Sequence, residues 1–404
     1  VESRGLGDVY KRQKYKLVLL LLTLSTGINA QLKLSDDEIE KLKKERVCNI
    51  EKRNVKIDWV RHVGKNSRLD NHGYGPRLSF NVLTTESSLK GIGELSRIEK
   101  ESYQDVCNEL LGKSVWETID PSKMLVKKEY RIIDVSIYDL IGIILDKPVY
   151  RLFGVDNKKV KCYSGMIYMD DLEFSTLEDG IEKVLENCRM DYSLGYRYFK
   201  LKIGRGAKWM SHDEGLERDI YVTKIINERF PDVKLLVDAN DGYSVDDCIE
   251  YIDRIKPIKL YWMEEPFKET EIDYLKLRKW QKNNNPDIFL ADGEFRPDFN
   301  LLMTLCDKGI IDVYLQDILG YGFTNWMELL PILKTKGIYA SPHCWGSGLR
   351  TIYSAYLGMI FDNIDIIEGV TCSSDDLDFE YNVKEGYFVC PEKPGFGITI
   401  NENK

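Results

Sequence analysis

From Val160 onward the chain alternates short apolar runs with segments of helical periodicity. The apolar runs predict strands, which start near Val160, Tyr198, Lys234, Leu260, Ile288, Ile311, Gly337 and Ile364. Helical patterns lie between them, as in Leu177–Leu194, Asp213–Arg229 and Ser244–Ile255. Eight such strands over residues 160–370 predict an α/β barrel of parallel strands with outer helices. An open, doubly wound sheet is the alternative, but no GxGxxG follows the first strand.

The residues before this alternation predict a small α+β domain over residues 31–159. Its expected elements are a charged, helix-like Leu32–Glu51, strands at Val55–Val63 and Leu78–Ser88, and a helix at Ile132–Leu145. The polar stretch Gly64–Arg77 predicts a surface loop between the two strands. Residues 371–404 contain no further strand–helix unit, and we expect this tail to pack back on the first domain.

The N-terminus carries two segments that we exclude from the fold. In residues 1–13, the run Asp8-Val9-Tyr10-Lys11-Arg12-Gln13 resembles the translation of a transposase end sequence used in DNA library preparation, which indicates an assembly artefact. Residues 14–30 have the pattern of a signal peptide: Lys14 and Lys16, the apolar run Leu17–Leu24, and a small residue at Ala30. This predicts a secreted or periplasmic protein. A buried strand or helix is the alternative for the apolar run, which is too short to span a membrane.

Composition narrows the range of partners. The 404 residues carry a formal net charge of -9, and no basic stretch interleaves with aromatic residues. Both features argue against a nucleic-acid partner. The nine cysteines are scattered without a CxxC motif, so they do not form a disulfide framework. No stretch after the N-terminal segment is long and apolar enough to predict a membrane span.

Lys200 and Lys202 lie on one predicted strand, in Tyr198-Phe199-Lys200-Leu201-Lys202-Ile203-Gly204. Residues i and i+2 of a strand point to the same face. Two crowded ammonium groups disfavour each other's charge, which can lower one pKa enough to make a base. The alternative is a solvated edge strand, where lysines are common.

Polar residues follow the ends of the other predicted strands, namely Asp238, Asn240, Glu264, Asp292, Glu294, Asp317, His343 and Glu368. Barrel enzymes build their sites at this end of the strands. Three carboxylates from neighbouring strands form an oxygen-only set that suits Mg²⁺. The candidates are Asp238, Glu264 and either Asp292 or Glu294. Singly, each carboxylate has an alternative role as a helix cap or a charge on the barrel rim.

His343 and Asp317 come from neighbouring strands and predict an oriented imidazole. A carboxylate beside a histidine fixes its tautomer and raises its basicity, which suits a general acid or base. The alternative is a core histidine bound to the backbone.

The order Lys-x-Lys, Asp-x-Asn, Glu-Glu-Pro, Gly-Glu, Asp, His and Glu resembles the mandelate racemase branch of the enolase superfamily. Gly91-Ile92-Gly93-Glu94 is similar to the early hairpin of that family's capping domain, and Asp139-Leu140-Ile141-Gly142 with Lys147–Gly154 is similar to its end. The resemblance covers nearly all of the chain after the N-terminal segments. It implies an α+β capping domain over a modified (β/α)7β TIM barrel, one Mg²⁺ per subunit, and a homo-oligomer.

The resemblance also implies a role for each strand-end residue. Asp238, Glu264 and Glu294 are the expected metal ligands, with Asp292 kept as the alternative third ligand. Lys202 is the expected base on one face of the substrate, with Lys200 near the substrate carboxylate. His343, paired with Asp317, serves the opposite face. Asn240 is expected to contact a substrate hydroxyl and Glu368 to donate to a carboxylate oxygen.

The chemistry implied is removal of the proton alpha to a carboxylate, through an enediolate. Loss of a β-hydroxyl then gives dehydration of an aldonic or aldaric acid to a 2-keto-3-deoxy acid, which we favour. Return of the proton from the other face gives a racemase or epimerase. An alternative of another class is a secreted barrel that binds metal and sugar acids without turnover. We expect the loop residues His72, Tyr74 and Arg77 to contact the substrate. Arg77 could pair a second carboxylate of an aldaric acid, but a plain surface charge is the favoured alternative for it.

Overall fold

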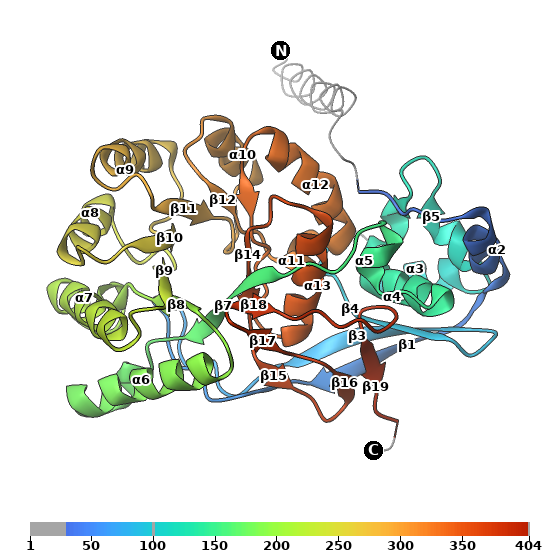
Figure 1. Ribbon diagram of the computed structural model, residues 1–404, viewed down its shortest axis with the longest axis horizontal. Coiled ribbons are helices and arrows are strands. Elements are labelled where there is room, and N and C mark those ends of the chain that lie inside the picture. The colour runs from blue at the N-terminus through green and yellow to red at the C-terminus, as the bar shows by residue number, and fades with distance from the viewer. Residues whose placement is uncertain (1–29, 99–101, 403–404) are drawn as a thin grey trace, which may run out of the picture.

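Eight parallel strands form a barrel in the computed structural model, which describes residues 30–98 and 102–402 (Figure 1). The strands are β7 (Val160–Ile167), β8 (Tyr198–Lys202), β9 (Lys234–Asp238), β10 (Leu260–Glu264), β11 (Phe289–Asp292), β12 (Val313–Tyr314), β13 (Tyr339–Ala340) and β14 (Ile366–Gly369). They pair in chain order, and β14 returns to pair with β7. A parallel bridge between Ala340 and Ile364 closes the ring. The alternation in the sequence therefore forms a barrel rather than an open sheet.

The helices after each strand surround the barrel (Figure 1). They are α6 (Leu177–Ser193), α7 (His212–Arg229), α8 (Val245–Arg254), α9 (Glu271–Asn284), α10 (Phe299–Asp307), α11 (Ile318–Tyr321), α12 (Phe323–Thr335) and α13 (Gly348–Ile360). Short 3-10 turns precede two of them, at Asp170–Glu173 and Arg205–Ala207. Side-chain oxygens of Thr176, Ser244 and Thr270 accept hydrogen bonds from backbone N–H groups of the first turns. Such caps satisfy donors that a helix cannot pair internally.

The barrel encloses a small apolar cluster of its own. It consists of Tyr163, Tyr198, Leu236, Trp262, Ala291, Val313, Leu315 and Ile366. A much larger apolar core lies between the strands and the helices and continues into the first domain. All five residues of β8 are buried, which excludes the edge-strand alternative for Lys200 and Lys202.

The first domain packs helices against an antiparallel sheet in the order β1–β3–β4. Its strands are β1 (Val47–Lys56), β2 (Asp58–Trp59), β3 (Arg77–Thr85), β4 (Lys90–Glu94), β5 (Ile119–Asp120) and β6 (Leu125–Val126). Its helices are α2 (Asp36–Lys44), α3 (Tyr103–Leu110), α4 (Asp134–Leu145) and α5 (Val149–Leu152), with 3-10 turns at Val115–Thr118 and Lys128–Ile133. Gly91 and Gly93 let β4 approach α4, because a Cβ at either position would lie less than 3.0 Å from atoms of α4.

One expectation for this domain was wrong in its detail. Only Asp36–Lys44 is helical within the predicted helix, and Val47–Lys56 forms the long strand β1. Most of β1 is at least partly exposed, and its charges face solvent. The polar and charged residues of β1 therefore suit an outer strand here, although the lysine- and glutamate-rich segment before it favours a helix.

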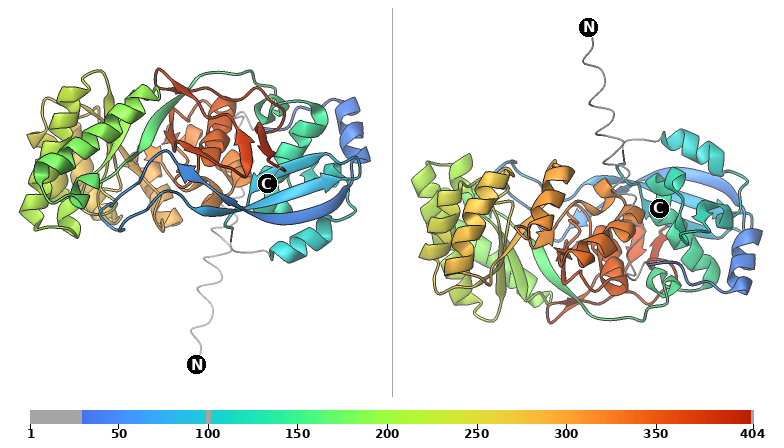
Figure 2. Two further views of the ribbon diagram at one scale, coloured as in Figure 1. Left: turned by 90° about the horizontal axis from the view of Figure 1, so that it is seen from below. Right: turned by 90° about the horizontal axis from the view of Figure 1, so that it is seen from above.

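The C-terminal tail connects the two domains (Figure 2). Its strands are β15 (Cys372–Ser373), β16 (Leu377–Phe379), β17 (Val383–Lys384), β18 (Tyr387–Phe388) and β19 (Ile398–Ile400). β15 pairs with β2 and β18 pairs with β7. The N–H of Phe396 also donates to Asp139 of α4, at 2.7 Å.

Two predictions concern the N-terminal residues 1–30. The artefact assigned to residues 1–13 and the signal peptide assigned to residues 14–30 lie outside the described residues, apart from Ala30. Among the residues described, no helix has the length and apolarity needed to cross a bilayer.

Candidate active site

Four charged side chains meet at the carboxyl ends of β8, β9 and β10. Lys202, Asp238 and Glu264 lie beside one another because the strand register pairs Lys202 with Asp238 and Asp238 with Glu264. Lys200 Nζ lies 2.8 Å from Glu264 Oε1 and 3.5 Å from Asp238 Oδ2. Lys202 pairs with Asp238 as well. All four side chains are buried, so these charges balance one another away from water.

Asp238, Glu264 and Glu294 form a candidate metal centre. One oxygen atom from each lies within 4.8 Å of the other two. Glu294 Oε2 is buried and has no hydrogen-bond partner, although it lies 3.4 Å from His343 Nε2, so it is free to act as a ligand atom. Oxygen-only donors fit a hard divalent cation such as Mg²⁺.

Asp292 does not join the metal centre. Its carboxylate binds the hydroxyl of Tyr274 on α9, and burial holds its pKa well above the usual range. The structure therefore groups Glu294, rather than Asp292, with Asp238 and Glu264.

The carboxylates shape the protonation of Lys200. Burial acts to lower the pKa of Lys200, but Glu264 and Glu368 outweigh it and raise that pKa well above its ordinary value. Burial also raises the pKa of Glu264 to about 8, against the opposing effect of Lys200. Crowding of two ammonium groups by itself favours a neutral amine, whereas buried carboxylates surround Lys200 and keep it charged.

His343 lies at the other end of the carboxylate cluster. Its Nε2 atom is 3.4 Å from Glu294 Oε2 and 3.6 Å from Glu368 Oε2. Its Nδ1 atom lies 3.6 Å from Asp317 Oδ2, and a parallel bridge joins the two backbones. Burial acts to lower the pKa of His343, but Glu294 and Glu368 raise it to about 9.

Glu368 and Asn240 complete the strand-end group. Glu368 Oε1 lies 3.3 Å from Lys200 Nζ, and its Oε2 accepts the N–H of Cys344 at 2.8 Å. Asn240 is buried with φ +45, and its side-chain oxygen has no hydrogen-bond partner. An unpaired amide oxygen beside a carboxylate cluster can accept from a hydroxyl group.

The loop between β2 and β3 brings one of its three predicted residues to this site. The His72 ring lies 4.8 Å from that of Tyr168 and 5.7 Å from that of Trp345. The Tyr168 ring lies 5.1 Å from the ammonium of Lys202. His72, Tyr168 and Trp345 therefore form an aromatic wall beside Lys202.

The other two predicted loop residues, Tyr74 and Arg77, lie away from the strand-end cluster. Tyr74 is 68% exposed and packs against His62. Arg77 is the exposed first residue of β3, where it lies opposite Lys56 of β1 in the antiparallel strand register. The structure does not bring either side chain to the strand-end cluster.

Sequence reasoning missed three residues of the site. Arg68 lies 2.7 Å from Glu265 and 3.7 Å from Glu294. Tyr168 directly follows β7, so extending the strand-end rule to the first barrel strand would have found it. Arg68 and Trp345 lie on loops, and their positions depend on tertiary contacts that no local pattern reveals.

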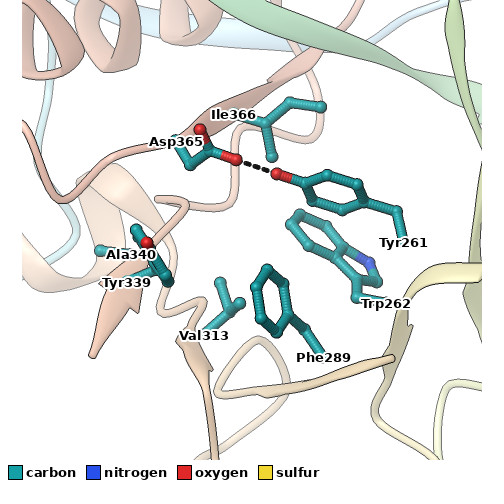
Figure 3. Close-up of a pocket in the computed structure, with 8 residues that line it drawn as sticks. All are labelled: Tyr261, Trp262, Phe289, Val313, Tyr339, Ala340, Asp365 and Ile366. Atoms are coloured by element: carbon teal, nitrogen blue, oxygen red, sulfur yellow. Dashed lines mark hydrogen bonds between the residues drawn. The ribbon is translucent and has the colours of Figure 1, made fainter. Parts of the chain in front are cut away.

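A pocket at the opposite end of the barrel is too small to compete with this site (Figure 3). It is lined by Tyr261, Trp262, Phe289, Val313, Tyr339, Ala340, Asp365 and Ile366. Its cavity of about 10 Å³ has room for no more than about one water molecule.

Comparison with known proteins agrees with this geometry. Residues 183–404 match the family described as enolase C-terminal domain-like. The chain belongs to this family. The resemblance drawn from the strand-end motifs is therefore confirmed, and so is the expectation of an enolase-type capping domain and barrel.

Two solved structures of this enolase superfamily fold are similar over most of the chain. A galacturonate dehydratase from Geobacillus sp., in complex with D-galacturonate and 5-keto-4-deoxy-D-galacturonate, has a TM-score of 0.83 and 28% identity over 89% of this chain and 95% of its own. A mandelate racemase/muconate lactonizing protein from Geobacillus sp. Y412MC10, in complex with magnesium and tartrate, has a TM-score of 0.83 and 28% identity over 89% and 94%.

A curated relative is similar over a shorter stretch. Arabinonate dehydratase from Saccharolobus solfataricus is 25% identical over 281 residues, which are 67% of this chain and 69% of that protein.

Proposed function

We propose that this protein is a Mg²⁺-dependent dehydratase of a sugar acid. The observation that carries the proposal is the placement of Lys202 and His343 at the two ends of one carboxylate triad. Lys202 pairs with Asp238, and His343 Nε2 lies 3.4 Å from Glu294. A substrate carboxylate bound through a cation at the triad would thus have a proton-transfer group on either side. The similarity to a galacturonate dehydratase and an arabinonate dehydratase supports the same reaction.

Asp238, Glu264 and Glu294 would hold the cation. When bound there, it supplies positive charge that stabilises the enediolate. Lys202, as its neutral amine, accepts the proton from the carbon alpha to the carboxylate; the neighbouring ammonium of Lys200 and a cation held by Asp238 would favour that neutral form. Lys200 stays charged beside Glu264 and offsets the negative charge that develops on the substrate. His343 donates a proton to the β-hydroxyl as its C–O bond breaks, so that water leaves and the enol becomes a keto acid.

The aromatic wall favours a substrate with one carboxylate. His72 Nδ1 lies 2.6 Å from the carbonyl of Gly64, and burial lowers the His72 pKa, which favours the neutral ring. Apart from Lys202 over Tyr168, no ammonium or guanidinium group lies over the Tyr168 or Trp345 ring in the described part of the chain, and the Arg350 guanidinium beside Trp345 is bound to Glu94. A second carboxylate would therefore meet no unpaired positive charge on the wall. We therefore propose aldonic or uronic acids ahead of aldaric acids.

A matched panel tests the function and its substrate class. Purified protein with Mg²⁺ in D₂O is offered galactonate, galacturonate and galactarate, and NMR follows keto-acid formation and exchange of the α-proton. Keto acid from galactonate or galacturonate supports the proposal. Preference for galactarate would overturn the one-carboxylate assignment.

Two other outcomes of the panel lead to different functions. Exchange without any keto acid would indicate a racemase or epimerase, since the two proton-transfer groups permit return of the proton from the other face. No exchange with a broad panel of sugar acids would indicate a binding protein.

Export and assembly are further proposals that rest on the sequence. The signal-peptide pattern of residues 14–30 supports a secreted or periplasmic location. Expression with these residues, followed by N-terminal sequencing of the exported chain, should give Gln31 as its first residue. Light scattering on the purified protein tests the homo-oligomer.

A further inference from the structure

The glutamate that ends the Gly91-Ile92-Gly93-Glu94 motif binds across the boundary between the two domains. Glu94 is the last residue of β4, and its partner Arg350 is on α13 of the barrel. Arg350 Nε lies 3.2 and 3.1 Å from the two carboxylate oxygens of Glu94, and Nη2 binds one of them as well. The two side chains are 5% and 6% exposed. This is a buried ion pair with several donors on one carboxylate.

The other nitrogen of Arg350 faces the proton-transfer site. Nη1 donates to the carbonyl of Trp345, which belongs to the aromatic wall. The same nitrogen lies 3.9 Å from Asp317 Oδ2, beyond hydrogen-bond range. The guanidinium is therefore next to Asp317, while its hydrogen bonds go to Glu94 and Trp345.

Asp317 is held so that one oxygen faces His343. Its Oδ1 accepts the N–H groups of Leu319 and Gly320, at 2.9 and 2.6 Å. Its Oδ2 lies 3.6 Å from His343 Nδ1 and also 2.7 Å from Nη2 of Arg97, a half-exposed residue of the first domain. A second arginine bound to Oδ2 would leave little room for the imidazole.

We propose that Glu94 is a positioning residue for the Asp317–His343 pair. It holds the Arg350 guanidinium, which keeps Asp317 Oδ2 open to His343 and fixes the Trp345 carbonyl. A buried guanidinium that loses its carboxylate turns to the nearest other one, because an unpaired buried charge is unfavourable. That carboxylate is Asp317. The structural part of this proposal stands alone, and only the effect on catalysis rests on the proposed function.

Histidine NMR tests the structural part without turnover. The chain has four histidines, so ¹⁵N-histidine labelling of the Mg²⁺-loaded protein gives few ring signals, and His343→Asn identifies those of His343. Glu94→Gln should move the His343 Nδ1 resonance and leave those of His62 and His212 in place. Glu94→Gln combined with Arg350→Met removes the competing guanidinium and should return the His343 resonance to its original position.

A control separates positioning from loss of any contact between the domains. Glu328 of α12 binds Arg131 of the first domain at 2.8 Å, without touching Asp317. Glu328→Gln should leave the His343 signals unchanged. An unmoved His343 resonance in Glu94→Gln, or a double variant that stays shifted, overturns the proposal. If Glu94→Gln does not fold, Glu94→Asp retains the charge on a shorter side chain and should give a smaller shift of the His343 Nδ1 resonance.

Proton exchange tests the catalytic part. With a sugar acid that the wild type turns over, Glu94→Gln should slow the His343-dependent step about 10- to 100-fold, the usual effect of losing an outer positioning group. Exchange through Lys202 should stay close to the wild-type rate. Equal slowing of both steps would contradict a positioning role. A wild type that turns over no sugar acid refutes the proposed function and leaves the NMR result valid.

Discussion

The two ends of the same eight strands have different tasks. At the carboxyl ends, Lys200, Lys202, Asp238 and Glu264 are buried charges that balance one another. At the amino ends, aromatic side chains such as Tyr261 and Phe289 close the barrel around a small pocket (Figure 3). Buried charges are unfavourable unless paired, whereas apolar packing stabilises the fold directly. The difference indicates that one end serves chemistry and the other serves stability.

Trp262 connects the two ends. Its ring lines the pocket at the amino ends, while its Nε1 donates to Glu264 Oε2 at 3.1 Å. Through Trp262, the aromatic cluster inside the barrel therefore supports the metal centre. This packing fixes the position of the Glu264 carboxylate before any cation or substrate binds.

Among single substitutions, the largest effect is expected from His343→Asn. Loss of a general acid typically lowers a rate about 10²- to 10⁴-fold, so keto-acid formation should fall by that factor. Exchange of the α-proton through Lys202 should persist, because Lys202 contacts Asp238 rather than His343. Unfolding temperature, measured in parallel, should change little. Unchanged keto-acid formation would remove His343 from the chemistry.

Metal removal separates Glu294 from Asp292. Chelation with EDTA should abolish activity, and added Mg²⁺ should raise the unfolding temperature, because it binds the folded state. Glu294→Gln should raise the Mg²⁺ concentration needed for this stabilisation about 10-fold or more. Asp292→Asn is the matched control at the same strand end. It should keep the stabilisation by Mg²⁺, since Asp292 binds Tyr274. The reverse pattern would make Asp292 the ligand.

Phe289→Ala tests the amino ends of the strands. The ring packs against Tyr261 and Tyr339, so its removal should lower the free energy of unfolding by about 3 kcal/mol. Chemical denaturation measures the loss, and kcat should stay near the wild-type value. A large fall in kcat with little loss of stability would break the division between the two ends.

A smaller effect is expected from Asp139, a buried carboxylate with no place in the site. Burial raises its pKa to about 7, while its two oxygens accept the N–H groups of Ile92 and Phe396. The folded state retains this proton up to about pH 7, whereas an unfolded aspartic acid loses it near pH 4. Stability should therefore fall as the pH rises from about 4 to 7, on the order of 1–3 kcal/mol.

The variant Asp139→Asn removes this titration. It loses one acceptor, which should destabilise it by about 1 kcal/mol at low pH. Its stability should then fall less than that of the wild type between pH 4 and 7, as chemical denaturation across this range would show. Parallel pH curves for the two proteins would contradict the raised pKa.

The barrel and most of its strand-end group could be predicted because both depend on local pattern. Strand periodicity placed Lys200 and Lys202 on one face, and parallel strands bring their carboxyl ends together. The loop residues could not be predicted in the same way. Arg68 reaches Glu265 and Glu294, whereas Tyr74 and Arg77 from the same loop do not, and only tertiary contacts decide which side chains turn inward. Residues 47–51, the first half of β1, were misread as helical because polar and charged residues suit the exposed side of an outer strand.

The role of Lys202 is tested most directly by α-proton exchange in Lys202→Met with Mg²⁺ and an active sugar acid in D₂O. Deuterium wash-in through the Lys202 face should fall at least about 10²-fold, whereas His343→Asn should retain it. Wash-in at the wild-type rate in Lys202→Met would contradict the central claim that the buried lysine at the end of β8 moves the proton.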